Sequence, residues 1–277
     1  MAWQPLTFGG VAAFACASWT RLWLVQILVA AVSALCFACL LLLGVIPVLD
    51  QAVERLPEKA EIAEGQLRWT GRETERLAEG PLLSIQVDLE ASSQLGQTSD
   101  ILVQLSKNHW KIVTIFGHIT GNYLASGSID LGQAVIQPRW DTWKPFVCVG
   151  LSLFWMLLLV LIWHLLALLY APVVSLLATL MQRQTGGSTC LKLAAAALLP
   201  GALFLSMSLV LFAIRQLELV GFLVSTGLHL GVGWIYLLVA PTCLPADPGL
   251  ASPSSNPFKP KDLVDAAPPA SKNPFRH

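Results

Sequence analysis

The sequence predicts an α-helical integral membrane protein with four transmembrane helices and a small extracytoplasmic β-rich (α+β) domain inserted between helices 1 and 2. Hydrophobic residues make up 55% of the 277 residues and charged residues only 12%, a balance typical of membrane proteins. The apolar residues collect in runs that match the ~20 residues a helix needs to cross a bilayer. Residues 61–90, in contrast, hold ten of the chain's charged residues, of which 17 are basic and 17 acidic in all. This concentration of charge predicts a separate polar domain.

The first apolar run predicts transmembrane helix 1 at residues 22–49, between Arg21 and Asp50. It is too long for the apolar core of a secretory signal and lacks a small-residue cleavage site, so we expect it to be retained as an anchor. Residues 1–21 carry several aromatic side chains, which often lie in the membrane interface. They are predicted to form a cytoplasmic or interfacial N-terminus.

The second run extends from Phe146 to Met181. As one straight helix it would measure about 54 Å, against a hydrocarbon core of about 30 Å. Pro172 removes a helical hydrogen bond, so we expect helix 2 at about 146–170 and a separate surface helix after it. A cytoplasmic loop at residues 181–192 follows.

Two further runs predict helix 3 at about 191–213 and helix 4 at about 217–240, so that residues 145–240 contain three transmembrane helices. Pro200 is expected to kink helix 3. Gly227 and Gly231 form a GxxxG pattern, which lets a neighbouring helix approach helix 4 closely.

Positive charge on the short loops predicts that both termini are cytoplasmic. Arg21, Arg183 and Lys192 lie in segments without Asp or Glu. Four spans agree with this orientation and place residues 50–144 outside. Residues 241–277 contain nine of the 17 prolines and are predicted to be a disordered cytoplasmic tail.

The extracytoplasmic domain is predicted to consist mostly of antiparallel β-structure. In LLSIQVDL, apolar residues alternate with Gln86 and Asp88, which is the period of a strand with one buried and one solvated face. DILVQLS and WKIVTIF are expected to pair as a hairpin across residues 107–109. Residues 119–136 have a β-rich composition with glycines at turn positions.

No residues of this domain show the spacing of a known catalytic motif, metal site or phosphate-binding loop. We therefore assign no catalytic, cofactor-binding or metal-binding residues, and we expect no cofactor. Solvated charge or a partner-binding face is the simpler interpretation. A membrane enzyme is a third hypothesis, and it requires the ionisable groups of the domain to converge in a pocket. These groups are Asp88, Glu90, Asp100, Asp130, Asp141, His109 and His118.

Two classes of protein are set aside. The net charge is zero and the chain has no basic block, which argues against nucleic-acid binding. The six cysteines lie in or beside apolar runs and none lies in the polar domain, which argues against a disulfide-stapled module.

His164 and His229 are the candidate intramembrane polar pair. An ionisable residue within a span is a functional hypothesis by default, because a charge there is costly. A proton relay or metal site would require further groups, and no acidic residue lies within any predicted span. The simpler interpretation is that both are neutral histidines, hydrogen-bonded within the bundle.

The tail contains Asn-Pro-Phe twice, each time followed by a basic residue. The tripeptide resembles the ligand of EH domains in eukaryotic trafficking proteins, and two copies raise avidity. The outer domain contains no N-glycosylation sequon, so it offers no support for a protein of the secretory pathway. The candidate docking residues are Asn256, Pro257, Phe258, Asn273, Pro274 and Phe275.

The overall layout resembles a bacterial membrane protein family of unknown function, some members of which are described as maltodextrin-utilisation accessory proteins. The likeness rests on one span, an outer β domain beginning near IAEGQL, and three further spans with AAAALLPGALF in the third. It covers about residues 20–240, carries no site residues and implies a bacterial cytoplasmic membrane. The Pro-rich tail departs from the family pattern.

The leading hypothesis is a non-enzymatic envelope sensor, docking or accessory protein, in which residues 50–144 contact an envelope protein or a transporter. A transport or permease-associated component is the alternative, with the three C-terminal helices lining a path. The composition implies the lipid bilayer as a partner, and a homo-oligomer remains an open alternative.

Overall fold

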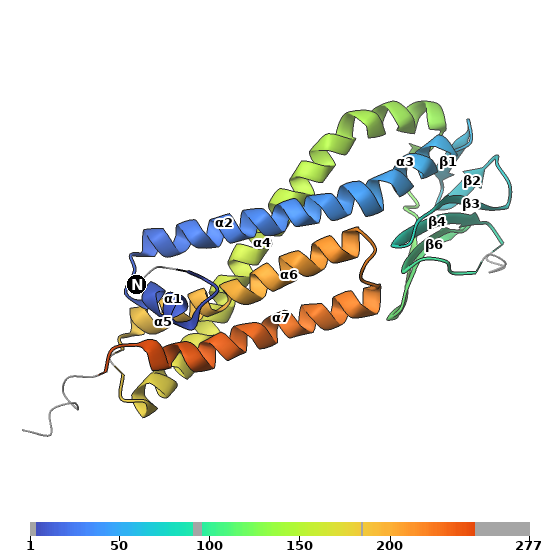
Figure 1. The fold of residues 1–277 in the computed structure, drawn as a ribbon. Coiled ribbons are helices and arrows are strands. Elements are labelled where there is room, and N and C mark those ends of the chain that lie inside the picture. The colour runs from blue at the N-terminus through green and yellow to red at the C-terminus, as the bar shows by residue number, and fades with distance from the viewer. Residues whose placement is uncertain (1–3, 91–95, 184, 247–277) are drawn as a thin grey trace, which may run out of the picture.

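The computed structural model describes residues 4–90, 96–183 and 185–246, which fold into a helix bundle with two small β-sheets at one end (Figure 1). Within this part of the chain, four helical segments are long and apolar enough to cross a membrane. They are Trp19–Glu54, Gln133–Leu180, Gly187–Ala213 and Leu219–Cys243. The sheets lie between the first two segments in the chain, as predicted, and we call them the sheet domain (60–90 and 96–130).

The first segment is one continuous helical rod. It consists of α2 (Trp19–Leu40), the π-helical turn η1 (Leu41–Val45) and α3 (Ile46–Glu54). The residues predicted for helix 1, 22–49, lie inside it. The rod extends past Asp50 because α3 is amphipathic and buries Val48 and Ala52 against the sheet domain.

The second segment, α4 (Gln133–Leu180), is a single helix of 48 residues and corrects the prediction for helix 2. The expected break at Pro172 does not occur, and the helix begins within the segment assigned to the β domain. A proline removes only its own N–H from the helical ladder, and a helix in apolar surroundings tolerates this loss. The first part of α4 runs in a different direction from the rest of the helix (Figure 1), and it contains Pro138 and Pro145, residues that commonly bend helices.

The third segment is interrupted in the middle. α5 (Gly187–Ala197) and α6 (Leu199–Ala213) meet at Leu198, two residues before Pro200, which confirms the expected kink. α7 (Leu219–Val239) follows and ends in the 3₁₀ turn η2 (Ala240–Cys243). In the most apolar stretch of α5–α6, 67% of the residues are buried, against 17% in α4 and 11% in α7, so α5–α6 is the centre of the bundle.

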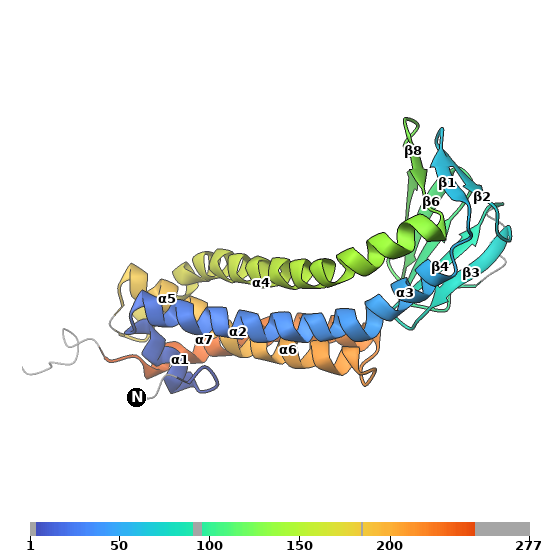
Figure 2. The ribbon, with the colours of Figure 1, turned by 90° about the horizontal axis from the view of Figure 1, so that it is seen from above.

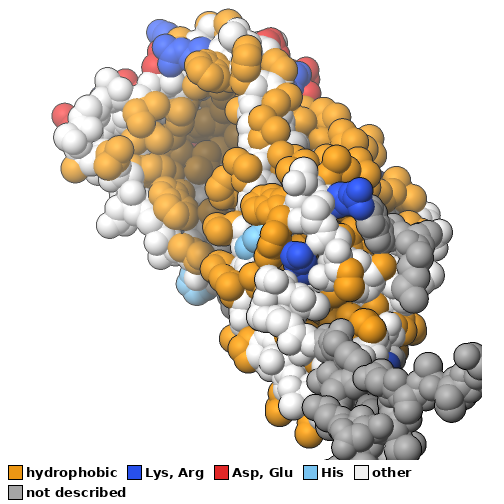
Figure 3. Space-filling view, turned by 90° about the vertical axis from the view of Figure 1, so that its left-hand side faces the viewer, with side chains coloured by type: hydrophobic (Ala, Val, Ile, Leu, Met, Phe, Trp, Pro, Cys, Tyr) orange, Lys and Arg blue, Asp and Glu red, His pale blue; other side chains and the backbone are white. Residues whose placement is uncertain are grey.

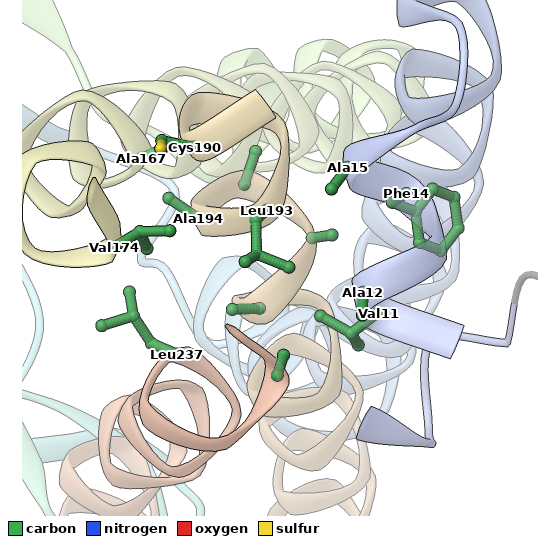
Figure 4. Close-up of a cluster of buried hydrophobic side chains, with 14 of the residues drawn as sticks. Val11, Ala12, Phe14, Ala15, Ala167, Val174, Cys190, Leu193, Ala194 and Leu237 are labelled. Atoms are coloured by element: carbon green, nitrogen blue, oxygen red, sulfur yellow. The ribbon is translucent and has the colours of Figure 1, made fainter. Parts of the chain in front are cut away.

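The four segments lie nearly side by side, with α2 between α4 and α6, and with α7 against α6 (Figure 2). Small side chains fill the core where α1 (Phe8–Ala15), α4, α5 and α7 meet (Figure 4). Ala194 and Ala196 are fully buried there, as are Val11 and Phe14 of α1. The N-terminal helix α1 is therefore docked on the bundle.

The sheet domain contains a three-stranded sheet, β2-β1-β8, and a five-stranded sheet, β3-β4-β5-β6-β7. In these sheets β4 and β5 are parallel and the other pairs are antiparallel, which confirms the mostly antiparallel prediction. The hairpin predicted across residues 107–109 is β5–β6. The strands are β1 (Ala60–Ala63), β2 (Gln66–Trp69), β3 (Thr74–Glu79), β4 (Leu83–Asp88), β5 (Ile101–Leu105), β6 (His109–Thr114), β7 (Gly117–Asn122) and β8 (Ser128–Asp130).

The solvated face predicted for β4 is wrong. Gln86 and Asp88 are only 1% and 0% exposed, so both faces of this central strand are buried. A cross-strand hydrogen bond compensates for the burial of Asp88, because Gln104 Nε2 donates to Asp88 Oδ2 at 3.0 Å. Solvated charge lies instead on β1 and β2, where Arg68 forms an ion pair with Glu61 at 3.0 Å.

The GxxxG pattern does not mark a close contact within the described chain. A Cβ atom added at Gly227 or Gly231 would meet no described atom within 4 Å. A Cβ added at Gly201 of α6 would collide with the carbonyl oxygen of His229 on α7. The closest approach of α6 and α7 is therefore at Gly201, which the pattern does not include.

Candidate functional site

A cleft of about 640 Å³ lies where the helix bundle meets the sheet domain, and we call it the junction cleft. The ends of α2, α6 and α7 form one side of it and loops of the sheet domain form the other. Ligand sites usually have volumes of roughly 300–1,000 Å³, apolar walls and a few polar groups. The polar residues are Gln97, Thr98, Ser99, Asp100, Arg215 and Glu218, and the apolar ones include Leu40, Leu82, Ile115, Phe212, Leu219 and Val220.

The loop at residues 96–100 forms the polar wall of the junction cleft, and neighbouring strands hold it in place. The Oγ atoms of Ser99 and Ser84 lie 2.6 Å apart in a buried hydrogen bond. The backbone amide of Asp100 donates to the carbonyl oxygen of Pro81 at 2.9 Å. The carboxylate of Asp100 is therefore presented to the cleft from a fixed backbone.

The turn between α6 and α7 forms the opposite wall. Arg215 has a left-handed backbone (φ 63°) just after α6, and the amide of Gln216 donates back to the carbonyl of Leu211 at 2.9 Å. This is a common way to end a helix. The rings of Phe212 and Phe222 stack across the turn with centroids 4.8 Å apart.

The charges of the junction cleft are one cation and two anions. Glu218 precedes α7 but its carboxylate makes no capping hydrogen bond to that helix. Partial burial, and then the negative charge of Glu218, raise the pKa of the Asp100 carboxyl above its ordinary value. None of the ion pairs in residues 4–90, 96–183 and 185–246 includes Arg215, Asp100 or Glu218. The cleft therefore presents charges that the described chain does not neutralise.

A polar clamp joins the two helices that connect the bundle to the sheet domain. Asp50 of α3 accepts hydrogen bonds from Trp140 Nε1 at 2.6 Å and from Lys144 Nζ at 3.0 Å, both on α4. Gln133 Nε2 donates to the carbonyl oxygen of Glu54 at 2.9 Å. The clamp ties the start of α4 to α3, so the two helices move together at this end.

The structure places His164 and His229 in separate surroundings. His164 Nδ1 lies 2.7 Å from the carbonyl oxygen of Val160 on its own helix, and the ring packs on Trp23 of α2 at 4.4 Å. His229 Nδ1 is hydrogen-bonded to the carbonyl of Thr226, also on its own helix. No hydrogen bond joins the two rings in the described part of the chain. The predicted pair is thus not a joined site.

Of the other candidate residues, Asp100 lines the junction cleft and the rest lie elsewhere. Asp88 is buried beside Gln104, Glu90 and Asp141 are exposed, and Asp130 accepts a backbone hydrogen bond. His109 and His118 lie on β6 and β7. The described residues include no group of three His, Cys, Asp or Glu side chains suited to a metal ion. The tail candidates Asn256, Pro257, Phe258, Asn273, Pro274 and Phe275 lie outside the described residues.

The sequence marks Arg215 and Glu218 only as a turn between two apolar helices. Charged residues at that turn are a signal for a polar surface at the end of the bundle. That Asp100 faces them depends on the parallel pairing of β4 and β5 and on the loop between these strands. No local pattern encodes this juxtaposition, so the sequence alone does not predict the cleft.

No family model, curated protein or solved structure matches the chain. The resemblance to the bacterial family of unknown function therefore stays a prediction.

Proposed function

We propose that the protein crosses the bacterial cytoplasmic membrane four times, with both termini in the cytoplasm and the sheet domain outside. We further propose that it is a non-enzymatic sensor or docking protein, an accessory to an envelope protein or transporter. The observation that carries this proposal is the junction cleft. A cleft large enough for a small ligand lies directly against the ends of three apolar helices. Binding in this cleft would therefore change the position of those helices.

The distribution of charge supports this orientation. Arg183 and Lys192 lie at the end of the bundle away from the sheet domain, and the described chain has no Asp or Glu at that end. Figure 3 looks toward this end, and hydrophobic side chains cover much of the flank of the bundle in that view. An excess of Lys and Arg on short loops marks the cytoplasmic side of membrane proteins.

The connection between the two regions supports a sensing role. The cleft has one wall in the sheet domain and one in the bundle, and the clamp at Asp50 joins α3 to α4. The π-helical turn η1, which contains Gly44, also borders the cleft. Such turns occur often at functional sites. Binding that favours one arrangement of the two walls would shift the helices toward it.

The orientation is tested by thiol labelling in a background without native cysteines. Glu64→Cys, on the exposed surface of the sheet domain, is expected to react with a bilayer-impermeant maleimide in intact cells. Ser188→Cys, at the start of α5, is the matched control and is expected to react only after the membrane is permeabilised. The reverse pattern would refute the orientation.

The docking role is tested with photoreactive residues at two exposed apolar positions. At Leu124, in the sheet domain, we expect crosslinks to a specific protein of the envelope. At Leu161, on the outer side of α4, we expect crosslinks to lipid. A sheet domain that yields no protein crosslink, with labelling as predicted above, would argue against docking and leave the orientation intact.

A transport component is the second candidate, and the break in α5–α6 favours it. Discontinuous helices often carry substrate sites near the middle of the membrane. Gln26 of α2 is fully buried, and its side-chain amide has no hydrogen-bond partner in the described chain. Gln26→Leu and His164→Leu would abolish transport if these groups line a path. A docking protein would keep its Leu124 crosslink in both variants.

A further inference from the structure

We propose that the junction cleft binds the headgroup of a phospholipid that carries a primary amine, a phosphoethanolamine group entering from the outer leaflet. This inference rests on the proposed function, because the cleft lies at headgroup level only if the four helices cross a bilayer. The lipid would be either the signal that the sheet domain senses or a membrane anchor for that domain.

The position of the cleft fits a lipid headgroup. Its floor is made by apolar side chains at the ends of the helices, among them Leu40, Phe212 and Val220. Polar headgroups begin where the hydrocarbon core of a bilayer ends. A cleft of about 640 Å³ accommodates a headgroup and glycerol. The acyl chains would leave along α7, where Val220 and Val224 are 62% and 56% exposed.

The charges of the cleft match a ligand that carries both signs. Arg215 presents a planar guanidinium, which pairs well with two oxygens of a phosphate group. Asp100 and Glu218 are close enough for their charges to repel, and neither has an ion-pair partner in the described chain. An ammonium group between them would relieve this repulsion and donate hydrogen bonds to both carboxylates.

The same charges discriminate between headgroups. A phosphatidylglycerol headgroup would pair with Arg215 but leave the two carboxylates repelling one another. A phosphatidylcholine headgroup brings a cation, but its quaternary ammonium has no N–H to donate. Phosphatidylethanolamine satisfies all three charged residues, because a primary ammonium has three donors and its phosphate lies on the same headgroup. A site built for hydrogen-bond donors rejects analogues that lack them.

An exposed apolar hairpin tip lies at the mouth of the cleft. Ile115 lines the cleft and is 51% exposed, and its neighbour Phe116 is 80% exposed between β6 and β7. Exposed apolar side chains of this kind often mark contacts with a membrane or partner. Contact of this tip with the bilayer surface would hold the mouth of the cleft against the lipid headgroups.

The test is native mass spectrometry of the purified full chain, titrated separately with phosphatidylethanolamine, phosphatidylcholine and phosphatidylglycerol of the same acyl chains. We expect the apparent Kd for phosphatidylethanolamine to be about tenfold lower than for the other two, the ratio that one good interaction supplies. Free phosphoethanolamine is a further arm, and we expect it to bind much more weakly because it lacks contact with the apolar wall. Comparable binding of the free compound would overturn the lipid assignment.

Three variants test whether the lipid binds in the junction cleft. Arg215→Gly keeps the left-handed turn, which glycine adopts readily, and removes the guanidinium. Asp100→Asn and Glu218→Gln keep shape and remove charge. Each is expected to weaken phosphatidylethanolamine binding by about five- to tenfold. Asp100→Asn and Glu218→Gln are also expected to remove the preference for phosphatidylethanolamine, whereas Arg215→Gly is expected to keep it, because all three lipids carry the phosphate that Arg215 binds. Arg72→Gly and Asp141→Asn, at exposed sites outside the cleft, are matched controls and should leave the binding unchanged.

Equal affinity for the three lipids, or unchanged binding in the three variants, would overturn the inference. Calcium binding that requires Asp100 and Glu218, without a preference for phosphatidylethanolamine, would overturn it in favour of a cation site. The thiol labelling of Glu64→Cys separates this failure from failure of the proposed function. If labelling is as predicted and the lipid preference is absent, the inference alone falls.

Discussion

Several serine and threonine hydroxyls of the bundle bond to a carbonyl of their own helix, whereas polar side chains of the sheet domain bond to a neighbouring strand or loop. In the bundle, Ser206 Oγ donates to the carbonyl of Ala202, one turn back on its own helix, at 2.9 Å. In the sheet domain, Gln104 reaches across from β5 to Asp88 on β4 at 3.0 Å. The bundle repeats its pattern at Ser152, Thr179, Ser208 and Thr226, with an exception at Ser33 of α2, which accepts from Trp155 Nε1 of α4 at 3.2 Å. In the sheet domain, Ser84 bonds to Ser99 of the loop before β5, and Tyr123 donates to the carbonyl oxygen of Ser106.

The difference shows that the two regions derive their specificity from different interactions. A hydroxyl bonded to its own helix does not join two helices, so the contact between α6 and α7 relies on close packing of small residues, as at Gly201. Cross-strand bonds instead fix which strands pair. Burial raises the pKa of Tyr123 to about 12, so its hydroxyl stays a donor to the Ser106 carbonyl even in mildly alkaline solution.

The largest effect is expected where the bundle packs most closely. Gly201→Leu would force a side chain against the His229 carbonyl and push α6 and α7 apart. We expect a loss of about 3 kcal/mol in the free energy of unfolding in detergent micelles, at the upper end for overpacking. Gly227→Leu is the matched control on an open surface, with an expected change under about 0.5 kcal/mol. Equal losses in both variants would contradict the importance of close packing at Gly201.

An intermediate effect is expected from the sheet domain. Gln104→Leu removes a donor from the buried Asp88 carboxylate, at a cost of about 1–3 kcal/mol. Amide hydrogen exchange of β4 and β5 is the appropriate measurement, because it reports local opening. Arg68→Ala, which removes the exposed ion pairs to Glu61 and Glu64, is expected to cost less than about 1 kcal/mol. If Arg68→Ala opens these strands as much as Gln104→Leu, cross-strand polar bonds are not what stabilises them.

The smallest effect is expected from a buried hydroxyl of the bundle. Ser206→Ala removes the bond to the Ala202 carbonyl, but that carbonyl belongs to the regular helix and keeps a backbone partner. We expect less than about 0.5 kcal/mol of change in the same unfolding measurement used for Gly201→Leu, because a hydroxyl bonded to its own helix joins no second element. A loss above about 1 kcal/mol would show that Ser206 joins α6 to a neighbouring helix.

Apolar runs, turn residues and strand periodicity predict much of this fold. The four apolar segments, the kink near Pro200 and the β5–β6 hairpin follow from local composition, because the residues that determine them are adjacent in the chain. The same reasoning fails at Pro172, because the tolerance of a helix for proline depends on its surroundings. It also fails at Gln86 and Asp88, since polar side chains in a central strand can be buried when partners such as Gln104 lie across the sheet.

The candidate site was less predictable than the fold. Asp100 was recognisable as a carboxylate of the polar domain, while Arg215 and Glu218 belong to a turn more than 100 residues further along the chain. Only folding of the chain brings Asp100, Arg215 and Glu218 to one cleft. His164 and His229 each bond to a carbonyl of their own helix, which agrees with the simpler interpretation that both are hydrogen-bonded within the bundle.

The uninterrupted length of α4 has a mechanical consequence. At 1.5 Å per residue, its 48 residues make about 70 Å of helix that starts at the sheet domain, changes direction near its start and ends at Leu180. A tilt of about 5° over a straight length of about 50 Å displaces the far end by about 4 Å, most of one helical turn. A small rotation of the sheet domain would thus displace residues on the opposite side of the molecule without any helix having to unfold.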